Sequence, residues 1–207
     1  MIGIIDYKAG NLASVRNALE RLDVENFVSA DPDKLSEADG IIFPGVGHAE
    51  SAMQALKEVD MDRYLLSTTQ PVLGICLGMQ LLFSSTEESP TGSLGLIEGR
   101  LKKFDPTRSK VPHMGWNTVE LTSTHPLVRD LGASPWFYFV HSYYAPVSEF
   151  TVGECSYQVP FTAITVRDNY MGVQFHPEKS GKAGKQLLSN YVQFVTESQN
   201  TVQTSSS

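Results

Sequence analysis

The sequence predicts an α/β protein with a central, mostly parallel, doubly wound sheet, helices on both faces, and antiparallel additions in the C-terminal half. Two observations predict this fold. In the first half of the chain, short apolar runs alternate with helical patterns, as they do in a parallel sheet covered on both faces. From Gly95 onward, strand-like runs follow one another across turns rich in Pro, Gly and Ser, which favours antiparallel pairing. The 207 residues, 41% of them hydrophobic, are enough to bury a sizeable core.

The first half of the chain begins with an apolar run at residues 2–5, which predicts a buried strand. Gly10 and Asn11 then open a helix, with Asn11 as its N-cap. The apolar residues of this helix recur at helical spacing: Leu12, Val15, Leu19 and Leu22. Residues 27–28 predict a short strand, and the Asp-Pro pair at 31–32 predicts an N-cap and the first position of the next helix.

The following elements take the chain to its C-terminus. A buried strand is expected at residues 40–43, helices near 49–57 and 62–68, and a strand into Cys76 with a helix beyond it that includes Met79, Leu82 and Phe83. Later strands are expected at residues 100–104, 119–121, 136–140, 163–166 and 171–175. One apolar face marks the last helix, formed by Leu187, Leu188, Tyr191, Phe194 and Val195. We expect a single domain over residues 1–196 and a flexible polar tail over 197–207.

Composition and charge exclude several functional classes. A net charge of −7 disfavours nonspecific binding to nucleic acid. The two cysteines, Cys76 and Cys155, do not form a disulfide framework and suit a reducing compartment. No apolar run is long enough for a signal peptide or a bilayer span, so we expect a cytoplasmic protein. Zinc-ligand spacing and phosphate-binding glycine motifs are absent from the sequence, and we expect neither a metal nor a cofactor.

Residues 71–80 (Pro-Val-Leu-Gly-Ile-Cys-Leu-Gly-Met-Gln) have the layout of a nucleophile elbow, with Cys in place of Ser. An apolar strand ends in Gly-x-Cys-x-Gly and becomes a helix, and the glycines allow the tight turn because a Cβ would crowd it. Cys76 would then lie at a helix N-terminus, where the dipole favours the thiolate. The alternative interpretation is a buried core cysteine.

Two other stretches would complete a catalytic site. Residues 174–178 (Gln-Phe-His-Pro-Glu) contain His176, which Pro177 biases towards extended geometry, so that His176 and Glu178 share a face. We expect His176 to be the base for Cys76 and Glu178 to orient the imidazole. A histidine satisfied within a turn is the structural alternative.

The third stretch, residues 44–47 (Pro-Gly-Val-Gly), follows a predicted strand. The N–H of Leu77 is one expected oxyanion donor, and a backbone N–H of Gly45, Val46 or Gly47 is the second. A plain loop is the alternative interpretation. Because all three stretches end predicted strands, they are expected to meet at one edge of the sheet.

These motifs resemble those of class I glutamine amidotransferases, and the resemblance runs from the first predicted strand to the last helix. It implies a flavodoxin-like core and hydrolysis of L-glutamine through a glutamyl thioester on Cys76. Further stretches resemble those of the family branch that works in histidine biosynthesis, above all residues 43–48 (Phe-Pro-Gly-Val-Gly-His) and 112–117 (Pro-His-Met-Gly-Trp-Asn). In that branch the glutaminase forms a heterodimer with a (β/α)₈-barrel cyclase, which receives the ammonia and makes imidazole glycerol phosphate and aminoimidazole carboxamide ribotide.

By the same resemblance, Gln80, Ser142 and Tyr143 would hold the amino acid end of glutamine, and Asn11, Tyr138 and Lys179 would lie at the cyclase interface. Sheet packing or solvent exposure is the alternative for each of these residues. Three other functions stay open at this point. They are the glutaminase of another synthase (pyridoxal phosphate or purine synthesis), a stand-alone cysteine hydrolase of related fold, and a non-catalytic binding module.

Overall fold

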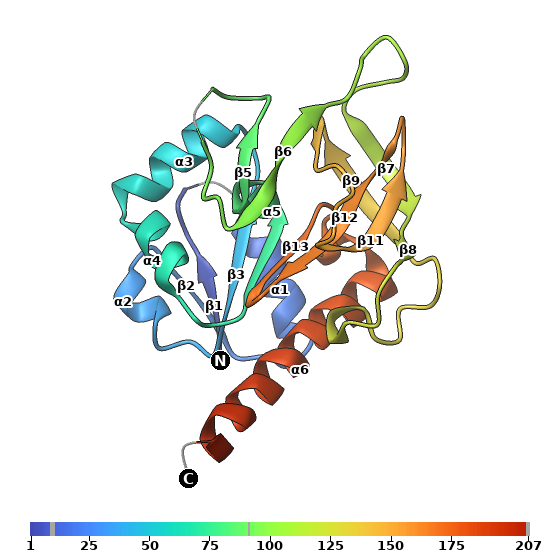
Figure 1. Cartoon of the computed structure of the whole chain (residues 1–207). Helices are drawn as coiled ribbons and strands as arrows, with labels where there is room; N and C mark the ends of the chain where they lie inside the picture. The colour runs from blue at the N-terminus through green and yellow to red at the C-terminus, as the bar shows by residue number, and fades with distance from the viewer. Residues whose placement is uncertain (9–10, 91, 206–207) are drawn as a thin grey trace.

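The computed structural model describes residues 1–8, 11–90 and 92–205, the last five of them by backbone alone (Figure 1). The N-terminal elements are β1 (Ile2–Ile5), α1 (Leu12–Glu20), β2 (Asn26–Ser29), α2 (Pro32–Leu35), β3 (Gly40–Gly45), α3 (Ala49–Glu58), α4 (Met61–Ser67), β4 (Val72–Cys76) and α5 (Leu77–Leu82). Two predicted N-caps are confirmed, because the side chains of Asn11 and Asp31 accept hydrogen bonds from the first turns of α1 and α2. Gly10 lies outside the described residues.

The C-terminal elements form the remaining strands and the longest helix. They are β5 (Phe83–Thr86), β6 (Ile97–Lys103), β7 (His113–Thr118), β8 (Glu120–Leu121), η1 (Pro126–Val128), β9 (Trp136–His141), β10 (Tyr143–Tyr144), β11 (Thr151–Ser156), β12 (Pro160–Arg167), β13 (Tyr170–Val173), η2 (Pro177–Lys179) and α6 (Gly181–Ser205). Helix α6 continues past residue 196, where the domain was expected to end. The division into a domain and a tail therefore stays a prediction.

The central sheet has eight strands in the order β2-β1-β3-β4-β13-β12-β11-β8. The first five are mutually parallel, and β12, β11 and β8 are added antiparallel at the β13 side. The parallel strands follow the flavodoxin-like order, with the fifth position occupied by a strand from late in the chain. This confirms the predicted fold class.

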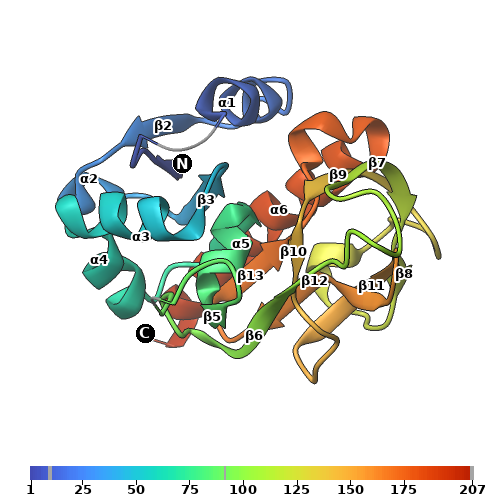
Figure 2. The same ribbon diagram turned by 90° about the horizontal axis from the view of Figure 1, so that it is seen from above.

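Helices cover both faces of the sheet and bury one hydrophobic cluster on each (Figures 1 and 2). One cluster joins the sheet to α1 and α6, and the other joins it to α2, α3, α4 and α5. Helix α6 is attached by the fully buried Tyr191, whose hydroxyl lies 2.7 Å from the carbonyl oxygen of Ile41 and 2.9 Å from that of Pro71.

The second half of the chain is where the predicted elements were least accurate. Strand β5 begins at Phe83, where the helix was expected to continue, and it pairs with β6 in parallel rather than antiparallel. Strand β7, which forms a six-residue antiparallel ladder with β9, was not predicted, and neither were β10 and β11. In β7 the usual pattern is inverted, because His113 is buried whereas Met114 and Trp116 are exposed. Apolar alternation therefore gave no sign of which face is inside.

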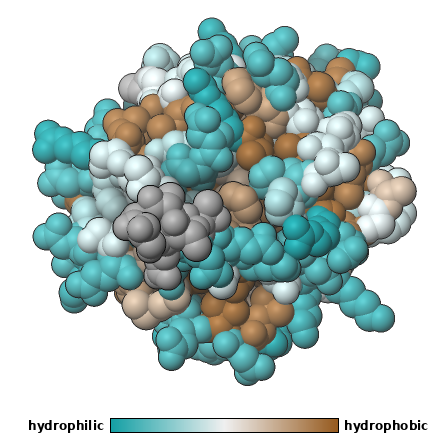
Figure 3. Space-filling model, turned by 60° about the horizontal axis from the view of Figure 1, so that its bottom comes forward, coloured by the Kyte–Doolittle hydropathy of each residue, from teal (hydrophilic) through white to brown (hydrophobic). Residues whose placement is uncertain are grey.

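The end of the molecule at the amino ends of the parallel strands is opposite the predicted site. Its surface is largely hydrophilic, with separate hydrophobic areas (Figure 3). Among the described residues, no helix is long and apolar enough to cross a membrane.

Candidate active site

Three neighbouring strands bring the predicted motifs together at their carboxyl ends. In the register of β3 and β4, Gly45 lies opposite Cys76, and in the register of β13 and β4, Val173 lies opposite Ile75. The loop after β3, the end of β4 and the segment after β13 therefore meet at one point, as expected for the edge of a parallel sheet.

Cys76 occupies a strained turn between β4 and α5. Its φ of 54° and ψ of −109° lie outside the regions that non-glycine residues normally adopt. A Cβ at Gly78 would lie 1.8 Å from the carbonyl oxygen of Phe43, and one at Gly74 would lie 2.7 Å from the amide nitrogen of Met79. Both glycines are therefore required for the turn, which confirms the predicted elbow geometry.

His176 and Glu178 form a buried pair beside the cysteine. The Nδ1 atom of His176 lies 2.8 Å from Oε1 of Glu178, and their side chains are 4% and 2% exposed. The predicted extended geometry holds at His176 but not beyond it, because Pro177–Lys179 form a 3₁₀ turn. The carboxylate thus reaches the ring through a turn rather than along an extended face. Since Glu178 accepts at Nδ1, the second ring nitrogen, Nε2, remains for proton exchange.

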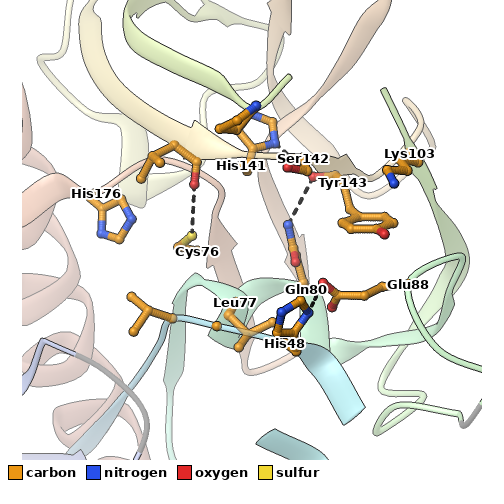
Figure 4. Close-up of a pocket in the computed structure, with 14 residues that line it drawn as sticks. His48, Cys76, Leu77, Gln80, Glu88, Lys103, His141, Ser142, Tyr143 and His176 are labelled. Atoms are coloured by element: carbon orange, nitrogen blue, oxygen red, sulfur yellow. Dashed lines mark hydrogen bonds and ion pairs between the residues drawn. The ribbon is translucent and has the colours of Figure 1, made fainter. Parts of the chain in front are cut away.

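The electrostatics of His176 favour the imidazolium form. Burial by itself lowers the pKa of the ring, but the proximity of Cys76, the hydrogen bond with Glu178 and the negative charge of both groups outweigh it and raise the pKa to about 10. Cys76 is 7% exposed, and its Sγ lies 3.9 Å from the carbonyl oxygen of Val140 and 3.8 Å from Nε2 of Gln174. Figure 4 shows Cys76 and His176 side by side at one end of a pocket.

That pocket has a volume of about 450 Å³ and contains most of the predicted site residues. Its lining includes Val46, Gly47, Cys76, Leu77, Gln80, Ser142, Tyr143 and His176. Gly45 does not line this pocket, since it packs against Tyr7 and α5, and Glu178 lies behind His176. The residues predicted at a partner interface, Asn11, Tyr138 and Lys179, also lie outside the pocket.

Six residues of the pocket lining were not predicted as site residues: His48, Glu88, Lys103, Pro112, Val140 and His141. Glu88 accepts a hydrogen bond from the amide of Ala49 at the start of α3 (2.7 Å) and lies 3.1 Å from Nδ1 of His48. It therefore holds the end of the 45–48 loop in place. His48 and Pro112 belong to the stretches 43–48 and 112–117 that carry the family resemblance, and Val140 and His141 directly precede the predicted Ser142. Glu88 and Lys103 belong to no recognisable motif, and only the packing of distant segments brings them to the pocket.

A chain of buried hydrogen bonds lies behind the pocket wall. The amide nitrogen Nδ2 of Asn117 lies 3.3 Å from Nε2 of His113, whose Nδ1 lies 3.0 Å from Nε2 of His141. The Nδ1 atom of His141 donates to the carbonyl oxygen of Tyr143 at 2.8 Å. That same oxygen accepts from Nε2 of Gln80 at 3.0 Å. The chain fixes the tautomer of both imidazoles, because a backbone carbonyl can only accept.

Comparison with known families assigns the chain to a class of enzymes. The model of the family "Glutamine amidotransferase class-I" matches residues 3–194. The chain belongs to the class I glutamine amidotransferase family, and it is a glutamine amidotransferase enzyme. The resemblance inferred from the motifs is thereby confirmed.

Curated relatives narrow the comparison to one branch of that family. The chain is 47% identical over 194 residues to "Imidazole glycerol phosphate synthase subunit HisH" of Bacteroides fragilis, covering 93% of this chain and 98% of the relative. It is 44% identical to the HisH subunit of Maridesulfovibrio salexigens (95% and 98% covered) and 43% identical to that of Pasteurella multocida (93% and 97%).

Solved structures of low identity share the fold. A protein from Thermoplasma acidophilum, described as one subunit of a GMP synthase, superposes with a TM-score of 0.77 at 16% identity, covering 98% of this chain and 96% of that one. A structure of PurLQS from Thermotoga maritima gives a TM-score of 0.71 at 18% identity, covering 94% and 98%.

Proposed function

We propose that the chain is the glutaminase subunit of imidazole glycerol phosphate synthase, in histidine biosynthesis and in the cytoplasm. It hydrolyses L-glutamine to L-glutamate and ammonia. One observation carries this proposal: a strained cysteine at the end of β4 lies beside a buried His176–Glu178 pair, in a chain 47% identical to a HisH subunit.

Transfer of the thiol proton of Cys76 to Nε2 of His176 gives the thiolate–imidazolium pair that the raised pKa of His176 favours, and the reaction starts from this pair. The thiolate attacks the side-chain carbonyl carbon of glutamine, so a C–S bond forms and negative charge moves to the carbonyl oxygen. As the tetrahedral intermediate collapses, the imidazolium gives its proton to the –NH₂ nitrogen, the C–N bond breaks, and the nitrogen leaves as ammonia. A water molecule, deprotonated by His176, then hydrolyses the thioester and releases glutamate. Glu178 keeps the imidazole in the correct tautomer and stabilises its charged form.

The oxyanion is held by backbone amides on the two segments that meet at Cys76. One donor is the amide of Leu77, the residue after the nucleophile. The second comes from the end of β3 or the loop after it: Gly45, the last residue of β3, lies opposite Cys76, and Gly47 in the loop has a φ of +103°, a conformation open to glycine. One such donor is typically worth about 3–4 kcal/mol of transition-state stabilisation.

The far end of the pocket suits the amino acid end of glutamine. Glu88 and Lys103 lie there with opposite charges (Figure 4), which matches the ammonium and carboxylate groups of a zwitterion. Gln80 uses its amide nitrogen to bond Tyr143 and Gln174, so its side-chain oxygen is the atom left to accept from the substrate ammonium. Ser142 and Tyr143 form the wall between these groups.

The partner is a cyclase with a (β/α)₈ barrel, which receives ammonia from the edge where Cys76 lies. The exposed face of β7 and β9 fits this role. Trp116 and Trp136 are 52% and 58% exposed, and the ring of Trp116 lies 6.2 Å from that of Tyr138. Exposed aromatic side chains of this kind mark protein interfaces. The exposed residues Asn11 and Lys179 complete the proposed surface.

Glutamate release measured with and without the cyclase, and with and without imidazole glycerol phosphate as the cyclase ligand, tests this proposal. We expect low activity alone and strong stimulation by partner and ligand. Stimulation by a different synthase, and none by the cyclase, would assign the chain to another branch. Glutamate release without a synthase, unchanged by one, would favour a stand-alone hydrolase.

Variants of the nucleophile test the chemistry itself. Cys76→Ala and Cys76→Ser should abolish hydrolysis without changing the fold. A glutamine-analogue electrophile should label Cys76 and spare Cys155, since burial raises the pKa of the Cys155 thiol to about 12. Equal labelling of both cysteines, or glutaminase activity in Cys76→Ala, would falsify the assignment.

The loop after β3 is the proposed switch for this activity. If its amide turns outward, the oxyanion hole keeps only the Leu77 donor, and a partner that favours the inward orientation would activate the enzyme roughly 10²–10³-fold. Gly47→Pro should remove this stimulation, because proline cannot adopt a φ of +103°. The measurement is ligand-stimulated turnover after confirming that the complex still forms. Full stimulation in the variant removes the loop from the mechanism.

A further inference from the structure

Gln174 is a fully buried polar residue next to the nucleophile, and the reaction described above gives it no role. Its side chain is 0% exposed. It follows the last residue of β13, and because Val173 lies opposite Ile75, Gln174 reaches the level of Cys76 on the neighbouring strand. The amide nitrogen Nε2 of Gln174 lies 3.8 Å from Sγ of Cys76.

The orientation of the Gln174 amide is determined by a backbone group. The carbonyl oxygen of Tyr143 can only accept, so Gln80 must direct its NH₂ group towards it, at 3.0 Å. The same NH₂ group donates to Oε1 of Gln174 at 2.9 Å. With its oxygen held by Gln80, Gln174 directs its own NH₂ group towards the sulfur of Cys76.

The neighbouring imidazoles prevent the opposite arrangement. The Tyr143 oxygen also accepts from Nδ1 of His141 at 2.8 Å, so both of its lone pairs are occupied by donors. Reversing the amide of Gln174 would place two NH₂ groups against each other, and reversing Gln80 as well would place its oxygen against the Tyr143 carbonyl. Each arrangement would therefore replace one of the observed hydrogen bonds by a contact between two donors or between two acceptors.

We propose that Gln174 is a further catalytic residue, whose side-chain amide donates a hydrogen bond to the Cys76 thiolate and so increases the fraction of the reactive form. This role rests on the proposed function only in naming Cys76 as the nucleophile. The sulfur of Cys76 lies between a group that favours its thiol form and a group that favours its thiolate form. The carbonyl oxygen of Val140, 3.9 Å away, accepts from a thiol, whereas the amide of Gln174 donates to a thiolate. Hydrogen bonds to charged groups are the stronger kind.

The test is the pH dependence of alkylation of Cys76 by iodoacetamide, in a Cys155→Ala background so that Cys76 is the only cysteine present. Gln174→Met removes the donor and keeps a side chain of similar length. We expect the midpoint of the alkylation profile to rise by about 1–2 pH units and the rate at pH 7 to fall about 10- to 100-fold, as for loss of a hydrogen bond to a charged group. Glutaminase kcat should fall with little change in KM.

The matched control is Gln70→Met, which removes an amide that donates to the carbonyl oxygens of Leu35 and Ala38, away from Cys76. It should lower stability without shifting the alkylation midpoint. Gln174→Leu repeats the measurement with a different shape in case Gln174→Met does not fold. An unchanged midpoint in a folded variant overturns the proposal. Because alkylation needs no glutamine, this outcome is distinct from a failure of the proposed glutaminase function.

Discussion

The buried histidines of the site form two groups: His176 by itself, and the hydrogen-bonded pair of His113 and His141. The pKa values of the two groups shift in opposite directions. His176 is 3% exposed, and its pKa is raised to about 10, whereas His141 is 5% exposed with a pKa lowered to about 3. His113, 4% exposed, has a pKa lowered to about 4. Burial is similar in all three, and it lowers the pKa in each case. The difference comes from the partners.

Among the described residues, a carboxylate is hydrogen-bonded to His176 and none to His113 or His141. Glu178 accepts from His176 and stabilises its positive charge, while the partners of His141 are a carbonyl oxygen and the ring of His113. The first arrangement suits a proton carrier, and the second suits a fixed, neutral hydrogen-bonding chain. Burial alone therefore does not determine the direction of the pKa shift of a histidine, and the charge of its neighbour does.

The largest expected effect is on activity and separates the two groups directly. His176→Ala should lower glutaminase kcat by about 10³-fold or more, because proton transfer to and from Cys76 is lost. His113→Phe, which keeps an aromatic ring between Phe139 and Tyr157, should retain most of the activity. Both are measured as glutamate release in the stimulated complex. Comparable losses in the two variants would contradict the distinction.

The next effect tests whether the Glu178 carboxylate causes the raised pKa of His176. Glu178→Gln keeps the shape of the side chain but removes its charge, so the pKa of His176 should fall towards the range of His141. The loss of activity should be about 10- to 100-fold smaller than in His176→Ala, since orienting groups matter less than the base itself. The measurement is kcat for both variants over a pH series. A greater loss in Glu178→Gln would reverse the assigned roles.

A smaller effect concerns stability in acid. The folded pKa values of His113 and His141 lie below the usual value of about 6.5. At pH values between the folded and the unfolded pKa of these histidines, the unfolded chain binds more protons than the folded chain. The free energy of unfolding should therefore decrease as the pH falls from about 6.5 towards 4. The raised pKa of His176 acts in the opposite sense, with its contribution lost as the pH rises towards 10.

Urea unfolding at pH 7.5 and pH 5 measures this acid effect. His113→Phe should decrease less in stability between the two pH values than the wild type, because one of the depressed groups is gone. An equal decrease in both proteins would show that the two neutral histidines do not account for it.

The smallest expected effect is on stability and concerns another buried polar group near Cys76, the hydroxyl of Tyr7. Among the described residues it has no hydrogen-bond partner, and burial, with a smaller contribution from Cys76, raises its pKa. Tyr7→Phe should raise the free energy of unfolding by about 1 kcal/mol, because the cost of an unsatisfied buried group disappears. Tyr191→Phe is the matched control and should lower it, since that hydroxyl donates to Ile41 and Pro71. Urea unfolding compares them, and a loss of stability in both would show that Tyr7 is satisfied in solution.

The geometry of the Cys76 turn and the proximity of His176 to Glu178 could be predicted because both features are local. The turn at Cys76 depends on Gly74 and Gly78 a few residues away, and His176 and Glu178 are joined within one short turn. Backbone sterics and short-range geometry act within such segments, so the local amino-acid sequence is enough to determine their conformation. The alternation of strands and helices predicted the parallel sheet for the same reason.

Tertiary structure decided the rest of the pocket. Glu88 and Lys103 reach it from segments that have no motif, and His113 is buried only because β7 pairs with β9. The direction of the Gln174 amide depends on a carbonyl 31 positions earlier in the chain, at Tyr143. Such contacts follow from strand register and from the need to satisfy every buried polar group, and both are set between segments far apart in the sequence.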